Sequence, residues 1–141
     1  MKDRQDGDHA VHLEFDARPE FLAEVRRLVE RLGAETGLSS TQMEAFLTAV
    51  DEAVANAVRH GSPRGAQSRI RVRCEPLPGG LLVEVRDQGK GFVVPDRPPM
   101  PDPEAPGGRG LPLMCALADS IEITSGRKGT TVTLKKTAKG S

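Results

Sequence analysis

The 141-residue chain contains no tryptophan or tyrosine and only four phenylalanines, and its 20 basic residues are balanced by 20 acidic ones. Proteins that bind nucleic acids usually neutralise phosphates with an excess of Lys and Arg, and single-strand binders add aromatic side chains on which bases stack. The composition therefore argues against direct nucleic-acid binding. At 37% hydrophobic residues the chain can still bury the core of one domain, built mainly from aliphatic side chains.

Long apolar runs and clustered cysteines are also missing. The longest uninterrupted apolar run, residues 113–118, is far shorter than the roughly 20 residues that span a bilayer. Residues 1–10 lack the apolar core of a signal peptide. Cys74 and Cys115 form no CxxC motif, which favours reduced thiols over a disulfide. We therefore expect a cytoplasmic protein that does not contact membranes.

The hydrophobic pattern predicts helices and hairpins in separate blocks. Strands are predicted at residues 11–15, 70–74, 81–85, 121–123 and 131–134. Apolar residues recur at helical spacing over residues 19–32 and 43–58, and a short apolar helix is predicted at 111–117. The order β-α-α-β-β-loop-α-β-β predicts an α+β fold, a two-layer sandwich with a mostly antiparallel sheet packed on helices.

A proline-rich segment interrupts this pattern. Six of the eleven prolines fall within residues 93–106, which excludes a helix or an inner strand there. Long loops in compact domains are often functional. We expect a lid at about residues 93–110, within one domain of residues 10–135, and flexible ends at 1–9 and 136–141.

Glu52 and Asn56 lie one turn apart on the predicted helix 43–58. At about 100° per residue, Glu52 lies opposite the centre of the apolar stripe and Asn56 lies about 40° from Glu52. One interpretation is an ordinary solvated face. The other is a carboxylate base beside an amide that ligates a hard cation.

Three glycine-containing segments are also candidates for ligand binding. Residues 87–92, Asp-Gln-Gly-Lys-Gly-Phe, form either a β-turn or a place of close ligand approach, and they match neither the dinucleotide fingerprint nor the Walker loop. Residues 107–111, Gly-Gly-Arg-Gly-Leu, form either a flexible hinge or a phosphate site at a helix start. Residues 129–132, Gly-Thr-Thr-Val, form a turn into a predicted edge strand.

Taken in order, these motifs are much more specific than any one of them. ExxxN on a helix, DxGxG after a hairpin, a proline-rich lid, GGxGL before a helix and GTT before a strand together resemble the Bergerat-type ATP-binding fold. Histidine kinases, gyrase-type topoisomerases and MutL-type proteins share this fold. The resemblance covers about residues 10–135. Residues 51–61, DEAVANAVRHG, are most similar to the bacterial anti-sigma-factor serine/threonine kinases.

The resemblance implies ATP and Mg²⁺ as ligands and assigns roles to matching residues. Glu52 matches the general base toward a partner serine, Asn56 matches the Mg²⁺ ligand, and Asp87 matches the residue that accepts a hydrogen bond from the adenine amino group. Thr131 matches a threonine that supports this Asp. The further nucleotide contacts that we expect are Arg59, Gly89, Gly91, Phe92, Gly107, Gly108, Arg109, Gly110 and Leu111.

The resemblance also implies protein partners: an anti-sigma-factor antagonist as substrate, a sigma factor and, as is common in the family, a second copy of the chain. An alternative is an ATP-binding regulatory module without phosphotransfer, against which Glu52 argues. A detached catalytic domain of a phosphorelay is a third interpretation, but the sequence shows no helix pair with a phosphoacceptor histidine. The predicted lid region 93–106 carries one cation, Arg97, so Arg109 or Lys90 is expected to contact the γ-phosphate.

Overall fold

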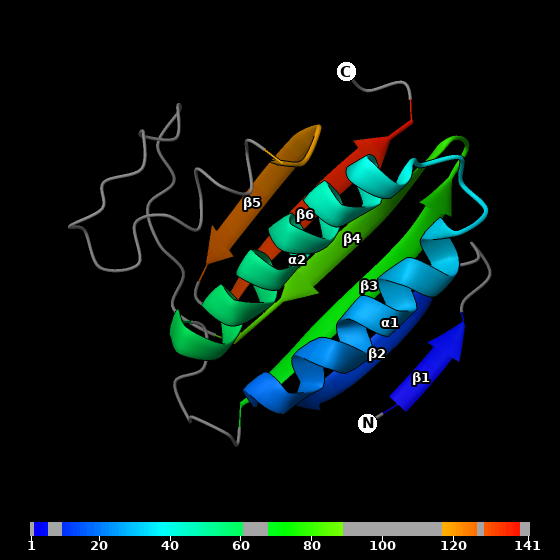
Figure 1. Cartoon of the computed structure of the whole chain (residues 1–141). Coiled ribbons are helices and arrows are strands. Elements are labelled where there is room, and N and C mark those ends of the chain that lie inside the picture. The colour runs from blue at the N-terminus through cyan, green and yellow to red at the C-terminus, as the bar shows by residue number, and fades with distance from the viewer. Residues whose placement is uncertain (1, 6–9, 61–67, 89–116, 127–128, 139–141) are drawn as a thin grey trace.

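The computed structural model describes residues 2–5, 10–60, 68–88, 117–126 and 129–138, and it leaves the side chains of 2–5 and 60 undescribed. Within these residues, two α-helices and a short 3-10 helix pack on one sheet (Figure 1). The helices are η1 (Pro19–Phe21), α1 (Leu22–Gly33) and α2 (Ser40–His60). The strands are β1 (Lys2–Gln5), β2 (Val11–Asp16), β3 (Arg69–Leu77), β4 (Gly80–Arg86), β5 (Ser120–Gly126) and β6 (Gly129–Thr137).

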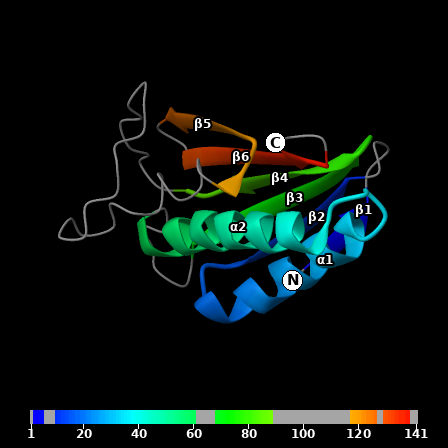
Figure 2. The same cartoon turned by 45° about the horizontal axis from the view of Figure 1, so that its top comes forward.

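Within the described ranges the sheet has six strands in the order β1-β2-β3-β4-β6-β5, and all neighbouring pairs are antiparallel. Both helices lie on the same face of this sheet, and Figure 2 shows the two layers edge-on. The predicted α+β two-layer sandwich is confirmed. No helix in the part of the chain that the structure describes is long and apolar enough to cross a membrane.

Strand alternation builds the core between the layers. Alternate side chains of the inner strands are buried, among them Phe15, Ile70 and Leu134. They meet the apolar stripes of α1 and α2, including Val25 and Phe46. Each fully buried aliphatic or phenyl side chain contributes about 1.5–3 kcal/mol relative to an exposed one, so this core dominates the stability of the fold.

The start of α2 is determined by its own sequence. The Ser39 hydroxyl accepts a hydrogen bond from the Gln42 N–H (3.1 Å), and the Gln42 side-chain oxygen accepts one from the Ser39 N–H (2.9 Å). This reciprocal pair is a capping box, which satisfies two backbone donors that a helix start leaves without partners. The capping box places the N-cap of α2 at Ser39.

The face of the sheet away from the helices carries charged side chains in cross-strand pairs. Glu14 of β2 lies opposite Arg71 of β3, and Arg71 Nε donates to Glu14 Oε1 at 2.7 Å. This hydrogen bond holds the pKa of Glu14 below its usual value. These charges partner one another, as expected of a solvated sheet face.

Both ends of the predicted domain differ from expectation. Lys2–Gln5, which we expected to be flexible, pairs with β2 as β1. β6 continues past residue 135 to Thr137, because Asp119 Oδ2 accepts hydrogen bonds from the Thr137 N–H (2.8 Å) and hydroxyl (3.1 Å). The last strand is also not an edge strand: β6 lies between β4 and β5, and β5 forms the edge. The predicted lid and all of the predicted helix 111–117 except Leu117 lie outside the described residues.

Candidate nucleotide site

Glu52 and Asn56 lie on the flank of α2 that faces away from α1. Ala49 and Ala53 are 0% and 2% exposed, so the buried face extends from the predicted stripe toward these two polar residues. With Glu52 as zero and about 100° per residue, Ala49 lies near 60° and Asn56 near 40°. The buried residues of α2 thus span about 60° to 220°, so Glu52 lies about 140° from the centre of the buried face, and Asn56 lies about 20° from its edge. Both side chains are partly exposed there, which suits contact with a ligand as well as with α2's neighbours.

The amide of Asn56 contacts a cation of its own helix. Arg59 Nη2 donates to Asn56 Oδ1 at 2.8 Å, one turn toward the end of α2. The amide oxygen thus points along the same flank as Glu52. Asn56 Oδ1 accepts a hydrogen bond from the positively charged Arg59 guanidinium, so this oxygen is available to bind a cation.

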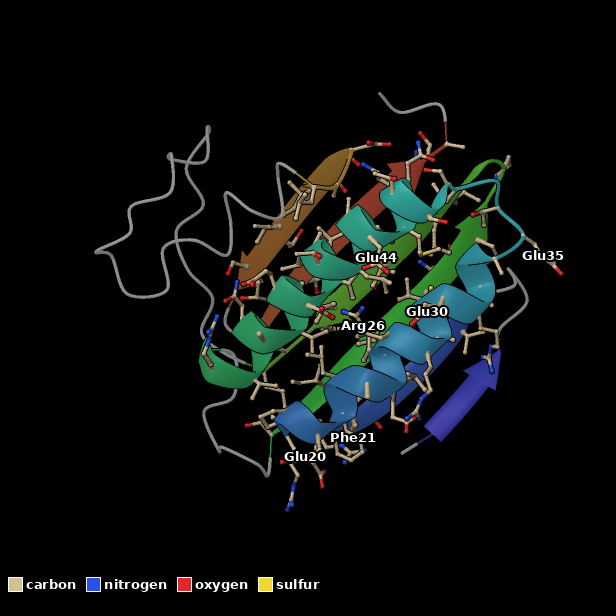
Figure 3. The ribbon with its side chains drawn as sticks, in the orientation of Figure 1. Glu20, Phe21, Arg26, Glu30, Glu35 and Glu44 are labelled. Carbon is tan, nitrogen blue, oxygen red and sulfur yellow. The ribbon has the colours of Figure 1, made fainter. Side chains whose placement is uncertain are left out.

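The opposite flank of α2 is tied to α1. Arg26 of α1 lies between the two helices (Figure 3), and Arg26 Nη1 donates to Asp51 Oδ2 at 2.5 Å. Burial raises the pKa of the Asp51 carboxyl above its usual value, although the Arg26 guanidinium opposes this. The other carboxylate oxygen, Asp51 Oδ1, is buried without a hydrogen-bond partner among the described residues. Asp51 and Glu52 are neighbours in the sequence, but they point to different sides of the helix.

Asp87 follows directly on β4 and keeps that strand's inward alternation. Leu81, Val83 and Val85 are buried under the helices, and two residues further Asp87 points to the same face because side chains of a strand alternate. The Asp87 N–H donates to the Thr130 carbonyl (2.9 Å), and Asp87 Oδ1 accepts from the Thr130 N–H (3.1 Å). The start of β6 therefore orients this carboxylate.

Gly129 allows this close approach of β6 to Asp87. Its φ of +139° is a backbone conformation that side chains disfavour, and a β-carbon added there would stand 1.9 Å from the Asp87 carbonyl oxygen. Sequence reasoning noted Gly129 only as part of a turn. The tight contact adds a second reason for glycine at this position.

Thr130, the neighbour of the predicted Thr131, forms two hydrogen bonds with Asp87 through its backbone. Thr130 is 3% exposed, and its hydroxyl lies 3.0 Å from the Ser125 hydroxyl. Alternation along β6 contained the signal that would have found it, because Thr130 has the same parity as the buried Val132 and Leu134. Thr131 has the opposite parity and pairs in register with Arg86. A nucleotide contact by Thr131 remains a prediction.

Gln88 is a second residue that sequence reasoning passed over. Its side-chain oxygen accepts a hydrogen bond from the Arg69 N–H at 2.8 Å, across to the first residue of β3. This hydrogen bond connects the residue directly after Asp87 to the start of β3, immediately before the predicted glycine turn.

The two halves of the candidate site lie at one end of the molecule. The last turn of α2, the end of β4, the end of β5 and the start of β6 all lie at the same end of the sheet in Figures 1 and 2. Topology thereby brings the last turn of α2, which contains Arg59, to the end that carries Asp87, and Asn56 and Glu52 lie about one and two turns earlier on the helix. The other predicted contacts lie outside the described residues: Gly89, Gly91, Phe92, Gly107, Gly108, Arg109, Gly110 and Leu111.

The donor chemistry of this end suits magnesium. Asn56 offers an amide oxygen and Glu52 a carboxylate, both on the exposed edge of one helix face. Among the described residues no group of three or more His, Cys, Asp or Glu side chains is arranged to hold a metal ion. Mg²⁺ is commonly held by one or two protein oxygens together with substrate phosphates and water, so the sparse set present here fits a metal that enters with a nucleotide.

Comparison with known proteins identifies relatives of this chain in sequence and in fold. Residues 15–136 match the family model of the histidine kinase-like ATPase domain. The serine-protein kinase RsbW of Bacillus licheniformis is 28% identical over 135 residues, covering 89% of this chain and 84% of the relative. The anti-sigma F factor of Geobacillus stearothermophilus is 32% identical over 135 residues, covering 89% of this chain and 90% of the relative.

A solved structure of the RsbU and RsbW domains of a Mycobacterium tuberculosis protein matches the fold with a TM-score of 0.65 at 24% identity. The match covers 91% of this chain but spans only 32% of that longer chain. A histidine kinase domain from Erythrobacter litoralis matches with a TM-score of 0.57 over 87% of this chain, at 18% identity. The family match, which extends over most of the sequence, shows that the chain belongs to the histidine kinase-like ATPase domain family.

Proposed function

We propose that this chain is an ATP- and Mg²⁺-dependent serine/threonine protein kinase that phosphorylates a serine of an anti-sigma-factor antagonist and also sequesters a sigma factor. The carrying observation is the pair Glu52 and Asn56, one turn apart on a partly exposed flank of α2, the helix whose last turn reaches the end of the sheet where β6 orients Asp87. The relatives named as serine-protein kinase and anti-sigma F factor align over nearly the whole chain, which supports this choice.

Asp87 is proposed to recognise adenine. Because the Thr130 N–H donates to Oδ1, the carboxylate plane is held in one orientation. A carboxylate has about four lone-pair sites and can accept from the exocyclic amine of adenine in addition. Gly129 then acts as a positioning residue, since only a glycine lets the Thr130 backbone come this close.

Glu52 is proposed to take the proton of the attacking serine hydroxyl. Phosphoryl transfer depends mainly on positioning of the reactants and neutralisation of the phosphate charge. One correctly placed base is the remaining group that the reaction needs. Asn56 Oδ1 would hold Mg²⁺, which supplies neutralisation of the phosphate charge when bound. Glu52 precedes Asn56 by one turn on the same flank, so base and metal ligand would face the same substrate.

The test is phosphate transfer from radiolabelled ATP to candidate antagonist proteins, with the wild-type chain and the E52Q variant. We expect label on a partner serine with the wild type, and a loss of at least 100-fold with E52Q because general base catalysis contributes about 10²–10⁴-fold. E44Q is the matched control, since Glu44 is an exposed carboxylate on the same helix, two turns before Glu52. It should leave transfer unchanged.

Each result decides between functions. ATP binding without transfer to any partner serine would favour a regulatory binding module over a kinase. Equal transfer by E52Q and wild type would remove Glu52 from its role as base. Failure of the wild type to bind ATP with or without Mg²⁺ would refute the proposal as a whole.

We further propose the finer points of this function. The chain acts in the cytoplasm as a homodimer, and the glycines 89, 91, 107, 108 and 110 with Phe92, Arg109 and Leu111 complete the nucleotide contacts. Sedimentation equilibrium tests the dimer. Loss of ATP affinity on alanine substitution of Gly108 and Gly110 tests the phosphate contacts.

A further inference from the structure

The two residues that follow β4 each bind a neighbouring strand through a side chain. β4 ends at Arg86. Asp87 Oδ1 accepts a hydrogen bond from the Thr130 N–H of β6 at 3.1 Å. The Gln88 side-chain oxygen accepts one from the Arg69 N–H of β3 at 2.8 Å. Because β4 lies between β3 and β6 in the sheet, these two hydrogen bonds hold the same short segment from opposite sides.

The hydrogen bond of Gln88 continues the ladder between β3 and β4. The last backbone pair of this ladder is Arg71 with Arg86. Two residues beyond this pair, the same register places Arg69 opposite Gln88. In a regular antiparallel pair a backbone carbonyl accepts such a hydrogen bond, whereas here the amide oxygen of the side chain accepts it. Gln88 therefore extends the contact with β3 beyond the end of β4.

The donor of this hydrogen bond is itself held by β2, on the other side of β3. Asp16 of β2 pairs with Arg69 in register, and its carboxylate also contacts the Arg69 guanidinium. One residue earlier, the Ser68 carbonyl accepts a hydrogen bond from the Ala17 N–H at 2.8 Å. The start of β3 is thus fixed to β2. Through the Arg69 N–H, the sheet determines where the backbone at Gln88 lies.

We propose that Gln88 is a positioning residue that fixes the direction of the Asp87 carboxylate and thereby determines the preference for adenine over guanine. This inference rests on the proposed recognition of adenine by Asp87. Adenine carries an amine donor where guanine carries a carbonyl acceptor. A carboxylate accepts from the amine and repels the carbonyl oxygen, so the preference depends on where the carboxylate points.

Gln88 acts on Asp87 through the backbone that joins them and contacts no nucleotide in this role. When β3 no longer holds this segment, its backbone can turn about the remaining contact with β6, and the carboxylate turns with it. The Gln88 hydrogen bond is exposed, so it contributes little to the stability of the fold. Its loss should therefore weaken the discrimination between bases more than it weakens the fold.

The experiment is calorimetric titration of the full chain in Mg²⁺ with non-hydrolysable analogues of ATP and GTP. The measured quantity is the ratio of the Kd for the GTP analogue to the Kd for the ATP analogue. Q88M keeps the length of the side chain but removes the oxygen, and we expect its ratio to fall at least about fivefold, the factor that one hydrogen bond corresponds to. Q88E keeps an oxygen acceptor and should retain the wild-type ratio, because its added charge acts equally on the identical phosphates of both analogues.

Amide hydrogen exchange of Arg69, followed by NMR, tests the contact itself without nucleotide. The Arg69 N–H should exchange at least about fivefold faster in Q88M than in the wild type, because it loses its acceptor. In Q88E it should exchange at the wild-type rate. This measurement distinguishes the loss of one hydrogen bond from a change in the whole fold.

A matched control is available at Gln42, whose side-chain oxygen also accepts a backbone N–H, that of Ser39 at 2.9 Å. Gln42 lies in the first turn of α2, at the other end of the sheet from Asp87 (Figure 1). Q42M removes a hydrogen bond of the same kind, so it should lower the stability. It should leave the ratio of the two Kd values unchanged.

The outcomes separate this proposal from the proposed function. An unchanged ratio in Q88M, or an equal fall in Q88M and Q42M or in Q88M and Q88E, would overturn the positioning role and leave the kinase proposal intact. An unchanged exchange rate of the Arg69 N–H in Q88M would overturn the contact on which the role depends. If the wild type binds neither analogue, both proposals fail.

Discussion

Substituting Gly129 with alanine should damage both the fold and the adenine site. The added β-carbon would stand 1.9 Å from the Asp87 carbonyl oxygen and 2.9 Å from its carbonyl carbon. Carbon and oxygen approach to about 3.3 Å at closest, so β6 and Asp87 must separate by about 1.4 Å. That movement breaks both hydrogen bonds between Asp87 and Thr130, at about 1 kcal/mol each. Backbone strain at this φ adds about 1–3 kcal/mol, so we expect a loss of about 3–5 kcal/mol.

The matched control is a substitution at Gly79, which distinguishes the effect of backbone strain from the effect of a clash with the added β-carbon. Gly79 also has a positive φ, +72°, but a β-carbon there would meet nothing within 4 Å. G79A should cost only the strain, about 1 kcal/mol, and should leave ATP affinity unchanged. Urea unfolding gives the stabilities, and titration with ATP should show at least about tenfold weaker binding for G129A. Equal stability and affinity of G129A and G79A would refute the view that Gly129 is required for close approach to Asp87.

Three further results are expected. R26M should lower the free energy of unfolding at pH 7 by about 1–2 kcal/mol, because it leaves the partly buried Asp51 carboxylate without its partner. This loss of stability should shrink as the pH falls toward the raised pKa of Asp51, because protonation removes the charge of the carboxylate. A loss of stability that does not depend on pH would contradict this explanation. K136M should cost about 1 kcal/mol in urea unfolding, because Lys136 Nζ donates to the Leu117 carbonyl at 3.1 Å; a stability equal to the wild type would show that this bond contributes nothing. Burial raises the pKa of the Cys74 thiol to about 12, so the thiol should not react with a disulfide reagent at pH 8 while the protein is folded. Peptide mapping should find Cys74 unlabelled in the folded protein and labelled in urea. Labelling of Cys74 in the folded protein would show that the thiol is accessible.

Local sequence was sufficient for most elements and for the faces they bury. The capping box at Ser39 and Gln42 needs only residues three apart, and the helix that follows has apolar residues at the spacing of its buried face. Alternation along β4 places Asp87 on the helix-covered face from the sequence alone. The same reasoning applied to β6 selects Thr130 over Thr131, since side chains of one parity share a face.

The contacts of Asp87 depended on strand order, which no local pattern contains. β6 lies beside β4 although β5 comes between them in the sequence, and only this neighbourhood brings Thr130 to Asp87. The buried face of α2 is wider than the predicted stripe for a similar reason. Alanine is buried or exposed according to its neighbours, so the burial of Ala49 and Ala53 was decided by packing.

The sequence by itself determined the type of each element and the one-turn spacing of Glu52 and Asn56, because both depend on backbone geometry between near neighbours. The pairing of β4 with β6, the Arg26–Asp51 link between helices and the close approach at Gly129 were decided by the tertiary structure. These contacts join residues far apart in the chain. Their formation depends on which apolar faces pack together, and that is a property of the whole core.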